Sequence, residues 1–248
     1  MADRYFAESP ITGSSAELTG PEAHHLAHVM RAKVGTEVTL FDGTGQEFAA
    51  QVQRVGRSTI ELTITSAVAV DRELNLEVTI GVALPKGDRQ RWLIEKLTEL
   101  GTHTVVPLIT HRTVAQPYDS ALAKLRRGVI EASKQCGRNR LLQIAEPLIW
   151  ETFMQQTPGS SVRLLAHPSV ESAVAENGPS SWINRAASAS QIACAIGPEG
   201  GLTDEEVQLA SAAGWQTVNL GQRILRVETA AVAMMAAIAL PATSTSLD

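Results

Sequence analysis

The first part of the chain alternates between apolar and polar positions over three short runs. These runs are Glu37–Phe41, Glu47–Val55 and Thr59–Ser66. Alternation with a period of two is typical of strands that bury one face, and the glycine-bearing segments at Asp42–Gly45 and Gly56 predict turns between them. A helix is predicted before the strands, from Pro21 to about Arg31, because proline fits the first turn of a helix. The pattern predicts a small β-barrel-like domain over residues 1–72.

From Leu74 onward, predicted strands and predicted helices alternate. The strands are Leu76–Leu84, Thr104–Leu108, Leu142–Ala145, Val162–Ala166, Gln191–Ile196 and Thr217–Leu220. The helices are Asp88–Leu100, Ser120–Gln135, Thr203–Ala213 and Glu228–Leu240. The segment Asn177–Ser190 is rich in Ser, Gly and Ala and is expected to form a loop, with room for one helical turn. Such alternation predicts an α/β domain with a mostly parallel sheet over residues 73–248.

The most informative segment runs from Ala193 to Glu206, where an apolar strand leads into the turn Gly197–Pro198–Glu199–Gly200–Gly201. Thr203 and Glu206 have the spacing of a capping box, which opens a helix. Glycines in such a turn allow positive φ angles and a close approach of the backbone to a ligand. Taken alone, the segment is also explained as an ordinary strand-to-helix turn.

A second glycine turn, Gly221–Arg226, follows the last predicted strand. In an α/β sheet, the loops at the carboxyl ends of the strands meet in one crevice, which is where ligands bind. The two glycine turns and a third loop at Ala166–Pro168 would therefore line a single pocket. Apolar residues there would suit a flat aromatic ring such as adenine, with backbone groups reading its edge. These apolar residues are Leu165, Ile196, Leu220 and Leu225.

The composition of the chain narrows the classes of protein to which it can belong. Of the 248 residues, 44% are hydrophobic and 19% are charged, which favours a folded chain with a real core. The longest apolar stretch, Ala230–Leu240, is shorter than the roughly 20 residues that span a bilayer. The N-terminus has no apolar signal segment, so we expect a cytoplasmic protein. Cys136 and Cys194 lie far apart, which disfavours a disulfide scaffold and a cysteine zinc site.

Charge is distributed unevenly along the chain. The net charge is −5, yet the segment from Lys86 to Arg140 contains eleven Lys and Arg residues against five Asp and Glu residues. A basic segment on an otherwise acidic chain is the pattern expected for a face that binds phosphates. A solvated helix surface explains the same charges equally well.

Several motifs together resemble a known family. The most specific pair is Gly197–Gly201 followed by Leu220–Ala230. Further matches are Lys96–Gly101, Pro107 with His111–Thr113, Gln135–Arg138, Arg4–Phe6 and His24–Arg31. Over nearly its whole length, the sequence resembles the SPOUT-class methyltransferases of the RsmE type. Lys134 departs from that pattern, in which an acidic residue is frequent before the glutamine.

The resemblance implies a methyltransferase that uses S-adenosylmethionine (SAM) to methylate N3 of a uridine in 16S ribosomal RNA, within the assembled small ribosomal subunit. It also implies a C-terminal SPOUT-type α/β domain with a trefoil knot, a PUA-like N-terminal β-barrel domain, and a homodimer with cofactor pockets near the interface. The apolar segment Ala230–Leu240 fits a dimer contact and fits burial within one subunit equally well. No membrane partner and no metal are expected.

The residues expected to bind SAM lie in and beside the three loops: Leu165, Ala166, His167, Ile196, Gly197, Pro198, Glu199, Gly200, Gly201, Leu220, Gly221, Ile224, Leu225 and Arg226. Loss of the N3 proton of uracil leaves negative charge on the ring oxygens, which a nearby cation stabilises. Arg226 is the first candidate for this catalytic role and Arg138 is the second. Glu199 is a candidate base, or it holds the backbone of its loop. No residue is a compelling general base.

Basic residues of the charged segment and of the small domain are expected to bind RNA: Arg4, Arg31, Lys86, Arg89, Arg91, Lys96, Arg112, Lys134, Arg138 and Arg140. Some of these, above all Lys96, would instead form ion pairs on a helix surface. His24 and His28 share a helical face, as zinc ligands would, but no third ligand has a suitable spacing. Structural or RNA-contacting histidines are therefore favoured. Trp92 is expected to pack in the core, with base stacking as the alternative.

Two other functions explain parts of the pattern. A non-catalytic RNA-binding factor for ribosome assembly, with a vestigial cofactor pocket, would keep the basic segment but would not need intact glycine turns. An α/β enzyme that acts on a small nucleotide would need the pocket but not the basic segment. Binding of SAM separates the first alternative from a methyltransferase, and binding of ribosomal RNA separates the second.

Overall fold

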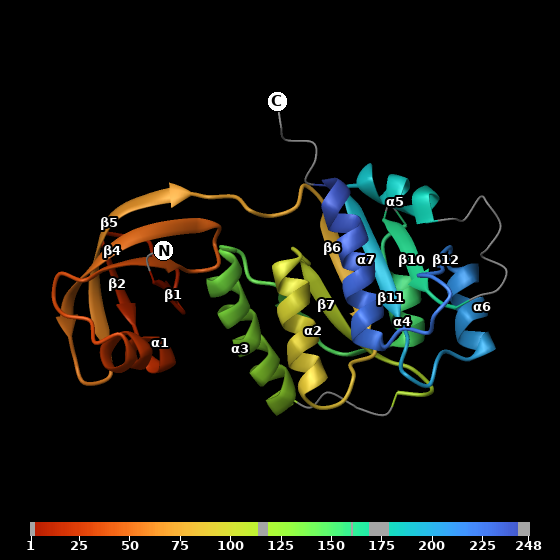
Figure 1. Ribbon diagram of the computed structural model, residues 1–248, viewed down its shortest axis with the longest axis horizontal. Coiled ribbons are helices and arrows are strands. Elements are labelled where there is room, and N and C mark those ends of the chain that lie inside the picture. Colours follow the sequence, from red (N-terminus) through yellow and green to blue (C-terminus); the bar gives the residue numbers. More distant parts are fainter. Residues whose placement is uncertain (1–2, 114–118, 160, 169–178, 243–248) are drawn as a thin grey trace. The chain divides into compact units, whose positions relative to one another are not determined.

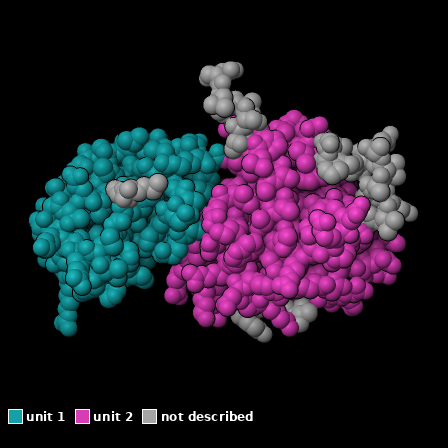
Figure 2. Space-filling view, in the orientation of Figure 1, with its two compact units in different colours: residues 1–73, 130–141 teal, residues 74–129, 142–248 magenta. Residues whose placement is uncertain are grey.

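The computed structural model describes residues 3–113, 119–159, 161–168 and 179–242. The chain divides into two compact units, which Figure 2 shows in different colours. Unit 1 comprises residues 1–73 and 130–141, and unit 2 comprises residues 74–129 and 142–248. The sequence placed a boundary between residues 72 and 73 but did not anticipate that residues 130–141 group with the N-terminal segment.

Unit 1 is built on a five-stranded sheet in the order β1-β3-β4-β5-β2. The strands are β1 (Arg4–Phe6), β2 (Ser15–Leu18), β3 (Glu37–Phe41), β4 (Gln46–Val55) and β5 (Ile60–Ala69). Strand β1 is parallel to β3, and the other neighbours are antiparallel. Helix α1 (Gly20–His24) and a π-helical turn, η1 (His25–Val29), follow β2.

The alternation of β4 explains how unit 1 forms its core. Phe48, Ala50 and Val52 are buried, while the residues between them are exposed. The three predicted strands are confirmed, but β1 and β2 were missed because three or four residues carry too little periodicity. The predicted helix from Pro21 to Arg31 is a short α-helix followed by the π-turn, and Arg31 itself has a φ of +55°.

Unit 2 has a parallel sheet in the order β12-β10-β11-β6-β7-β8, with β9 also paired to β7. The strands are β6 (Glu77–Val82), β7 (Thr104–Ile109), β8 (Gln143–Ile144), β9 (Leu148–Ile149), β10 (Val162–Ala166), β11 (Gln191–Ile196) and β12 (Gln216–Val218). The helices are α2 (Asp88–Glu99), α3 (Asp119–Cys136), α4 (Trp150–Gln156), α5 (Pro179–Ala187), α6 (Asp204–Ala212) and α7 (Val227–Ala242). Of α3, residues 119–129 belong to unit 2 and residues 130–136 to unit 1. The predicted α/β alternation and parallel sheet are confirmed.

Two helices of unit 2 differ from the expectation. Helix α5 occupies the described part of the segment that was expected to be a loop, because Trp182 and Ala186 are buried one helical turn apart among small polar residues. Helix α4 was missed altogether, although Trp150, Phe153 and Met154 bury one of its faces. In both cases a strong apolar face is carried by too few residues to stand out in the sequence.

Helix α7 packs on β6 and β11, with α2 and α5 beside it (Figure 1). Its residues Ala231, Met234, Met235 and Ile238 are buried within unit 2, whereas Leu240 is 73% exposed. The apolar stretch therefore fills the core of its own unit along most of its length. Among the residues that the structure describes, no helix is both long enough and apolar enough to cross a membrane.

Candidate functional site

Three loops of unit 2 enclose a cavity of about 330 Å³ at the carboxyl ends of β10, β11 and β12. The loops start together because Ala166, at the end of β10, pairs with Ile196 of β11 on one side and Val218 of β12 on the other. The lining residues are Ala166, His167, Pro168, Ile196, Gly197, Pro198, Glu199, Gly201, Leu202, Asn219, Leu220, Gly221, Arg223, Ile224, Leu225, Arg226, Val227 and Ala230.

The residues expected to bind the cofactor line this cavity, with the exception of Leu165 and Gly200. Leu165 belongs to the hydrophobic core of unit 2. Six lining residues were not among those expected to bind the cofactor, although all but Ala230 are adjacent in the chain to one that was: Pro168, Leu202, Asn219, Arg223, Val227 and Ala230. Their closeness in sequence to the three loops is the pattern by which they could have been identified.

The first glycine turn depends on glycine at two positions. A Cβ atom at Gly197 would lie 2.8 Å from Cγ of Leu202, so a larger residue there would require Leu202 to move. Gly201 has a φ of +74°, and its N–H donates to the carbonyl of Pro198 at 2.9 Å. The turn therefore brings its backbone to the cavity wall in a conformation that larger residues disfavour.

Contacts from the loop after β7 hold this first turn in place. Arg112 Nη1 donates to the carbonyl oxygens of Gly200 at 2.9 Å and Leu202 at 3.5 Å. Glu206, a buried carboxylate, accepts the N–H of Thr203 at 2.8 Å with one oxygen and the N–H of His111 at 2.8 Å with the other. The predicted capping box is confirmed, and it also ties the start of α6 to the loop after β7.

The second glycine turn leads into α7. The side-chain oxygen of Asn219 accepts the N–H of Gly221 at 2.9 Å, and Gly221 has a φ of +117°. Arg226 is exposed on the cavity wall, and its guanidinium group has no ion pair or hydrogen bond within the described ranges of the chain. The site thus has a positive charge that is not neutralised by the protein itself.

Arg89 links two carboxylates beside the cavity. Its guanidinium group lies 2.9 Å from Oε1 of Glu199, in the first glycine turn, and 3.5 Å from Oε1 of Glu228, in the first turn of α7. Glu228 is buried, and its other oxygen has no hydrogen-bond partner among the described residues. Arg89 therefore connects α2 to the first glycine turn and to the start of α7, and the charge of Glu199 is compensated by this ion pair.

His167 is the titratable ring of the third loop. Burial lowers the pKa of His167, although the carboxylate of Asp204 acts in the opposite direction. Its backbone N–H donates to the carbonyl of Val218 at 3.1 Å, and its Nδ1 atom is buried without a partner among the described residues. The His167 side chain therefore lines the cavity as a neutral imidazole, with its Nδ1 atom buried.

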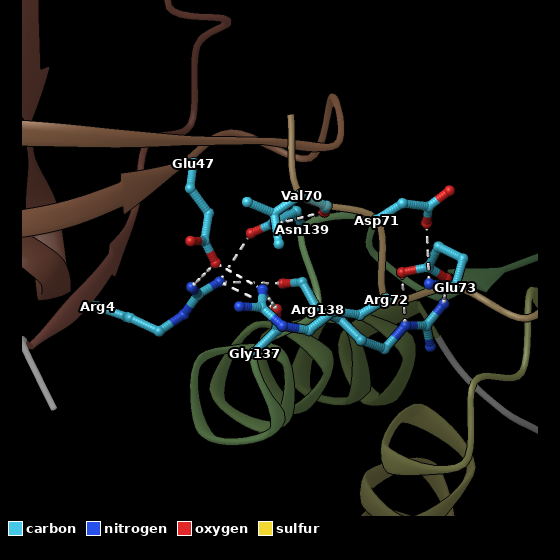
Figure 3. A network of polar contacts seen from close by, with 9 residues as sticks. All are labelled: Arg4, Glu47, Val70, Asp71, Arg72, Glu73, Gly137, Arg138 and Asn139. Carbon is cyan, nitrogen blue, oxygen red and sulfur yellow. Dashed lines mark hydrogen bonds and ion pairs between the residues drawn. The ribbon is translucent and has the colours of Figure 1, made fainter. Parts of the chain in front are cut away.

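Arg138, the second catalytic candidate, lies in a polar network of unit 1 (Figure 3). Its side chain is buried, and its Nε atom donates to Glu73 at 3.1 Å. Glu47 accepts hydrogen bonds from Arg4 and Arg72, and the Arg72 guanidinium also reaches the carbonyl of Gly137 at 2.8 Å. Burial alone would raise the pKa of Glu47, but the hydrogen bonds from Arg72 and Arg4 bring it below its usual range.

The residues expected to bind RNA fall into two groups. One group forms ion pairs with carboxylates: Arg4, Arg89, Lys96, Lys134 and Arg138. The other group is exposed and has no ion pair in the described part of the chain: Arg31, Lys86, Arg91, Arg112 and Arg140. The predicted ion pairing of Lys96 is confirmed, with Glu95 at 2.9 Å and Glu99 at 2.7 Å.

Two further residues are clarified by the structure. The expectation that Trp92 packs in the core is wrong, because its side chain is 44% exposed beside the exposed Arg91. The rings of His24 and His28 lie 4.7 Å apart, and no group of three potential metal ligands occurs among the residues that the structure describes.

Taken together, the parallel sheet and the loop-lined cavity define an α/β protein that binds a ligand at the carboxyl ends of its strands. The family model of the RNA methyltransferase domain matches residues 72–239, and that of the RNA methyltransferase PUA domain matches residues 18–65. The chain therefore belongs to this family of RNA methyltransferases. The expected PUA-like N-terminal part and α/β C-terminal part are confirmed.

Curated relatives and solved structures extend the comparison. The chain is 35% identical to ribosomal RNA small subunit methyltransferase E of Synechocystis over 94% of this chain and 75% of that protein, and 30% identical to the Bacillus subtilis enzyme of the same name over 95% of both. A ribosomal RNA small subunit methyltransferase E from Neisseria gonorrhoeae, solved with bound SAM, has a TM-score of 0.82 at 27% identity and covers 96% of this chain and 97% of its own. A Legionella pneumophila protein solved with SAM has a TM-score of 0.85 at 30% identity, with the same coverage of both chains.

Proposed function

We propose that this protein transfers the methyl group of SAM to N3 of a uridine in 16S ribosomal RNA within the assembled small ribosomal subunit. The observation that carries the proposal is the cavity of unit 2, which is built from the loops that contain the family motifs. The relatives named as ribosomal RNA small subunit methyltransferases, and the Neisseria structure with bound SAM, support the same reaction and cofactor.

The cavity fits SAM in chemistry. Ile196, Leu220 and Leu225 offer apolar surface to an adenine ring, and the glycine turns expose backbone groups that would bind its edge. The imidazole of His167 lines the same cavity and adds a polar side chain to it. When bound, SAM supplies a methyl group activated by its positively charged sulfur.

Arg226 is the proposed catalytic cation. Its exposed guanidinium group lines the cavity, so it is available to stabilise the negative charge that develops on the uracil oxygens as N3 loses its proton. Arg138 is the weaker candidate because its guanidinium group is buried against Glu73. Glu199 is proposed to hold its loop through Arg89, and the general base stays unassigned.

RNA binding is proposed for the exposed basic residues that have no carboxylate partner, namely Arg31, Lys86, Arg91 and Arg140. Cations that already pair with carboxylates would have to break an ion pair before they bind a phosphate. We assign Arg89 and Arg112 instead to the support of the cofactor loops, since both contact the first glycine turn.

The protein is further proposed to act as a cytoplasmic homodimer with a SPOUT-type trefoil knot in its C-terminal domain. The apolar side chain of Ile224 supports the dimer, because it is 82% exposed on the wall of the cavity. A second copy that covers this side chain would also close the cofactor pocket.

The proposal is tested by incubating the protein with methyl-labelled SAM and small ribosomal subunits that lack the modification, with naked 16S RNA in parallel. Digestion and mass spectrometry then locate the label. We expect N3-methyluridine at one site in the subunits and much less label in naked RNA. Cofactor binding without methyl transfer would contradict the proposed substrate, and absence of SAM binding would favour a non-catalytic RNA-binding factor.

A further inference from the structure

Unit 1 contains a second cavity, of about 730 Å³, which the proposed reaction does not use. Its walls come from the region of β1, from α1 and η1, and from the last turns of α3. The lining residues are Asp3, Arg4, Tyr5, Gly20, Pro21, Glu22, His24, His25, Val29, Glu131, Lys134 and Gln135. All of them belong to unit 1, so the cavity is a property of that unit alone.

Two hydrogen-bond donors in this wall have no partner. The side chain of Tyr5 is 0% exposed, and neither its hydroxyl group nor Nε of Arg4 has a hydrogen-bond partner within the described chain. Buried donors of this kind cost free energy unless a ligand or water satisfies them. Burial, together with the carboxylates of Asp3 and Glu22, raises the pKa of Tyr5 to about 12. The hydroxyl group therefore keeps its proton at neutral pH and is able to donate.

The charges of the cavity do not favour a free phosphate. The Lys134 ammonium group lies 2.9 Å from a carboxylate oxygen of Glu22 and 3.3 Å from one of Glu131, so its charge is already compensated. Asp3 adds a further carboxylate to the wall. A neutral ligand is therefore favoured over an anion.

The exposed imidazole of His25, beside the buried Tyr5, favours a flat ring as the ligand. The rings of Tyr5 and His25 lie 5.9 Å apart and are tilted by 46° to each other, and the Lys134 ammonium group lies 5.6 Å from the centre of the Tyr5 ring. A neutral ring that carries both acceptors and N–H donors would satisfy Tyr5 and Arg4 and would also donate to the carboxylates. Nucleobases have this combination of groups.

We propose that this cavity binds one unpaired nucleobase of the RNA that the protein modifies. The proposal rests on the proposed function for the identity of that RNA. Proteins that recognise RNA by sequence mostly bind unpaired bases, which stack on aromatic side chains and hydrogen-bond along their edges. The cavity in unit 1 thus reads a base that is distinct from the one that is methylated.

Two variants test the proposal on the full-length protein. Tyr5→Phe removes the unpartnered hydroxyl group and keeps the ring. Val29→Trp places a large ring at the cavity wall from a position that is 59% exposed, so the fold is expected to tolerate it. Val34→Trp is the matched control, because Val34 is also an exposed valine of unit 1, at 71%, and does not line the cavity.

The measurement is the equilibrium affinity for unmodified small ribosomal subunits, with SAM affinity and thermal unfolding measured on the same samples. We expect Tyr5→Phe to weaken subunit binding by about three- to tenfold, as the loss of one hydrogen bond does. Val29→Trp should weaken binding by about tenfold or more, since it blocks the cavity. SAM affinity should stay unchanged in both variants, and Val34→Trp should behave like the wild type.

The proposal would be overturned if Val29→Trp bound subunits as tightly as Val34→Trp does. It would also be overturned if Tyr5→Phe bound subunits with wild-type affinity and was more stable to heat than the wild type. Failure of the proposed function would give a different experimental result. If the wild type transfers no methyl group, while both cavity variants still bind subunits more weakly than the control, the base-binding cavity stands and the reaction is wrong.

Discussion

Two sets of arginines, one in each unit, differ in what their guanidinium groups contact. In unit 1, Arg4, Arg72 and Arg138 all donate to glutamate side chains, and two of them also bind backbone carbonyls near the end of α3 (Figure 3). In the second glycine turn of unit 2, Arg223 and Arg226 are exposed on the cavity wall, without an ion pair in the described segments of the chain. The same residue type therefore stabilises the fold in the first set and provides unneutralised charge in the second.

The largest effect is expected at Arg138. Replacement by alanine removes a buried guanidinium group and leaves the partly buried Glu73 without its ion-pair partner, which should lower the free energy of unfolding by about 3 kcal/mol. Urea unfolding followed by circular dichroism measures this loss. Arg54→Ala is the control, because Arg54 and Glu61 form a pair whose side chains are 67% and 42% exposed, and it should change stability far less. Wild-type stability with lost methyl transfer would instead make Arg138 catalytic.

Arg226 should show the opposite behaviour. Arg226→Ala is expected to lower kcat by about 100-fold, because removal of one group that stabilises a developing negative charge has an effect of that size. Stability and SAM affinity should remain near those of the wild type, and Arg226→Lys should recover part of the rate. The control is Gln222→Ala, an exposed residue of the same turn that does not line the cavity. Equal kcat values for Arg226→Ala and this control would exclude the proposed role.

A variant of Arg112 distinguishes support of the cofactor loop from RNA binding. Arg112→Ala removes the hydrogen bonds to Gly200 and Leu202, so it should weaken SAM binding by about tenfold, the effect of one charge-assisted hydrogen bond. Arg91→Ala, on the exposed surface of α2, should weaken RNA binding and leave SAM affinity unchanged. Isothermal titration with SAM and filter binding with 16S RNA distinguish the two. The reverse pattern would show that Arg112 contacts RNA directly.

The smallest expected effect is the contribution of His167 to the pH dependence of stability. Because burial lowers the pKa of His167 in the folded protein, the unfolded chain takes up the proton first as the pH falls below about 6.5. Stability should therefore fall over this range and level off below the pKa of the folded state. His167→Gln should remove this part of the pH dependence in urea-unfolding curves. A wild type that grows more stable relative to the variant as the pH falls would contradict the assignment.

The sequence predicted the fold best where one pattern extends over many residues. Strand β11 and the turn after it were found because an apolar run, three glycines and a capping box stand together between Gln191 and Glu206. Helix α5 was missed because only Trp182 and Ala186 mark its buried face in a segment of small polar residues. The grouping of residues 130–141 with unit 1 was not predictable, because it depends on contacts between segments far apart in the chain.

The candidate site, like the fold, was predicted only in part. The cavity was predicted because parallel strands bring the loops at their carboxyl ends together, so that three separate motifs imply one pocket. The contacts that support it were not predicted. Arg112 and Gly200 are 88 positions apart, and Arg89 and Glu199 are 110 apart, and no local pattern connects such partners. Basic residues consequently looked alike in the sequence, although some contact the first glycine turn and others have no ion pair in the described part of the chain.

The central claim is that the three loops of unit 2 hold the methyl donor. Hydrogen–deuterium exchange with and without saturating SAM tests it most directly, since the exchange of backbone amides reports where a ligand binds. The account predicts slower exchange in residues 166–168, 196–202 and 219–227. Protection confined to other segments, or no protection at any SAM concentration, would contradict it.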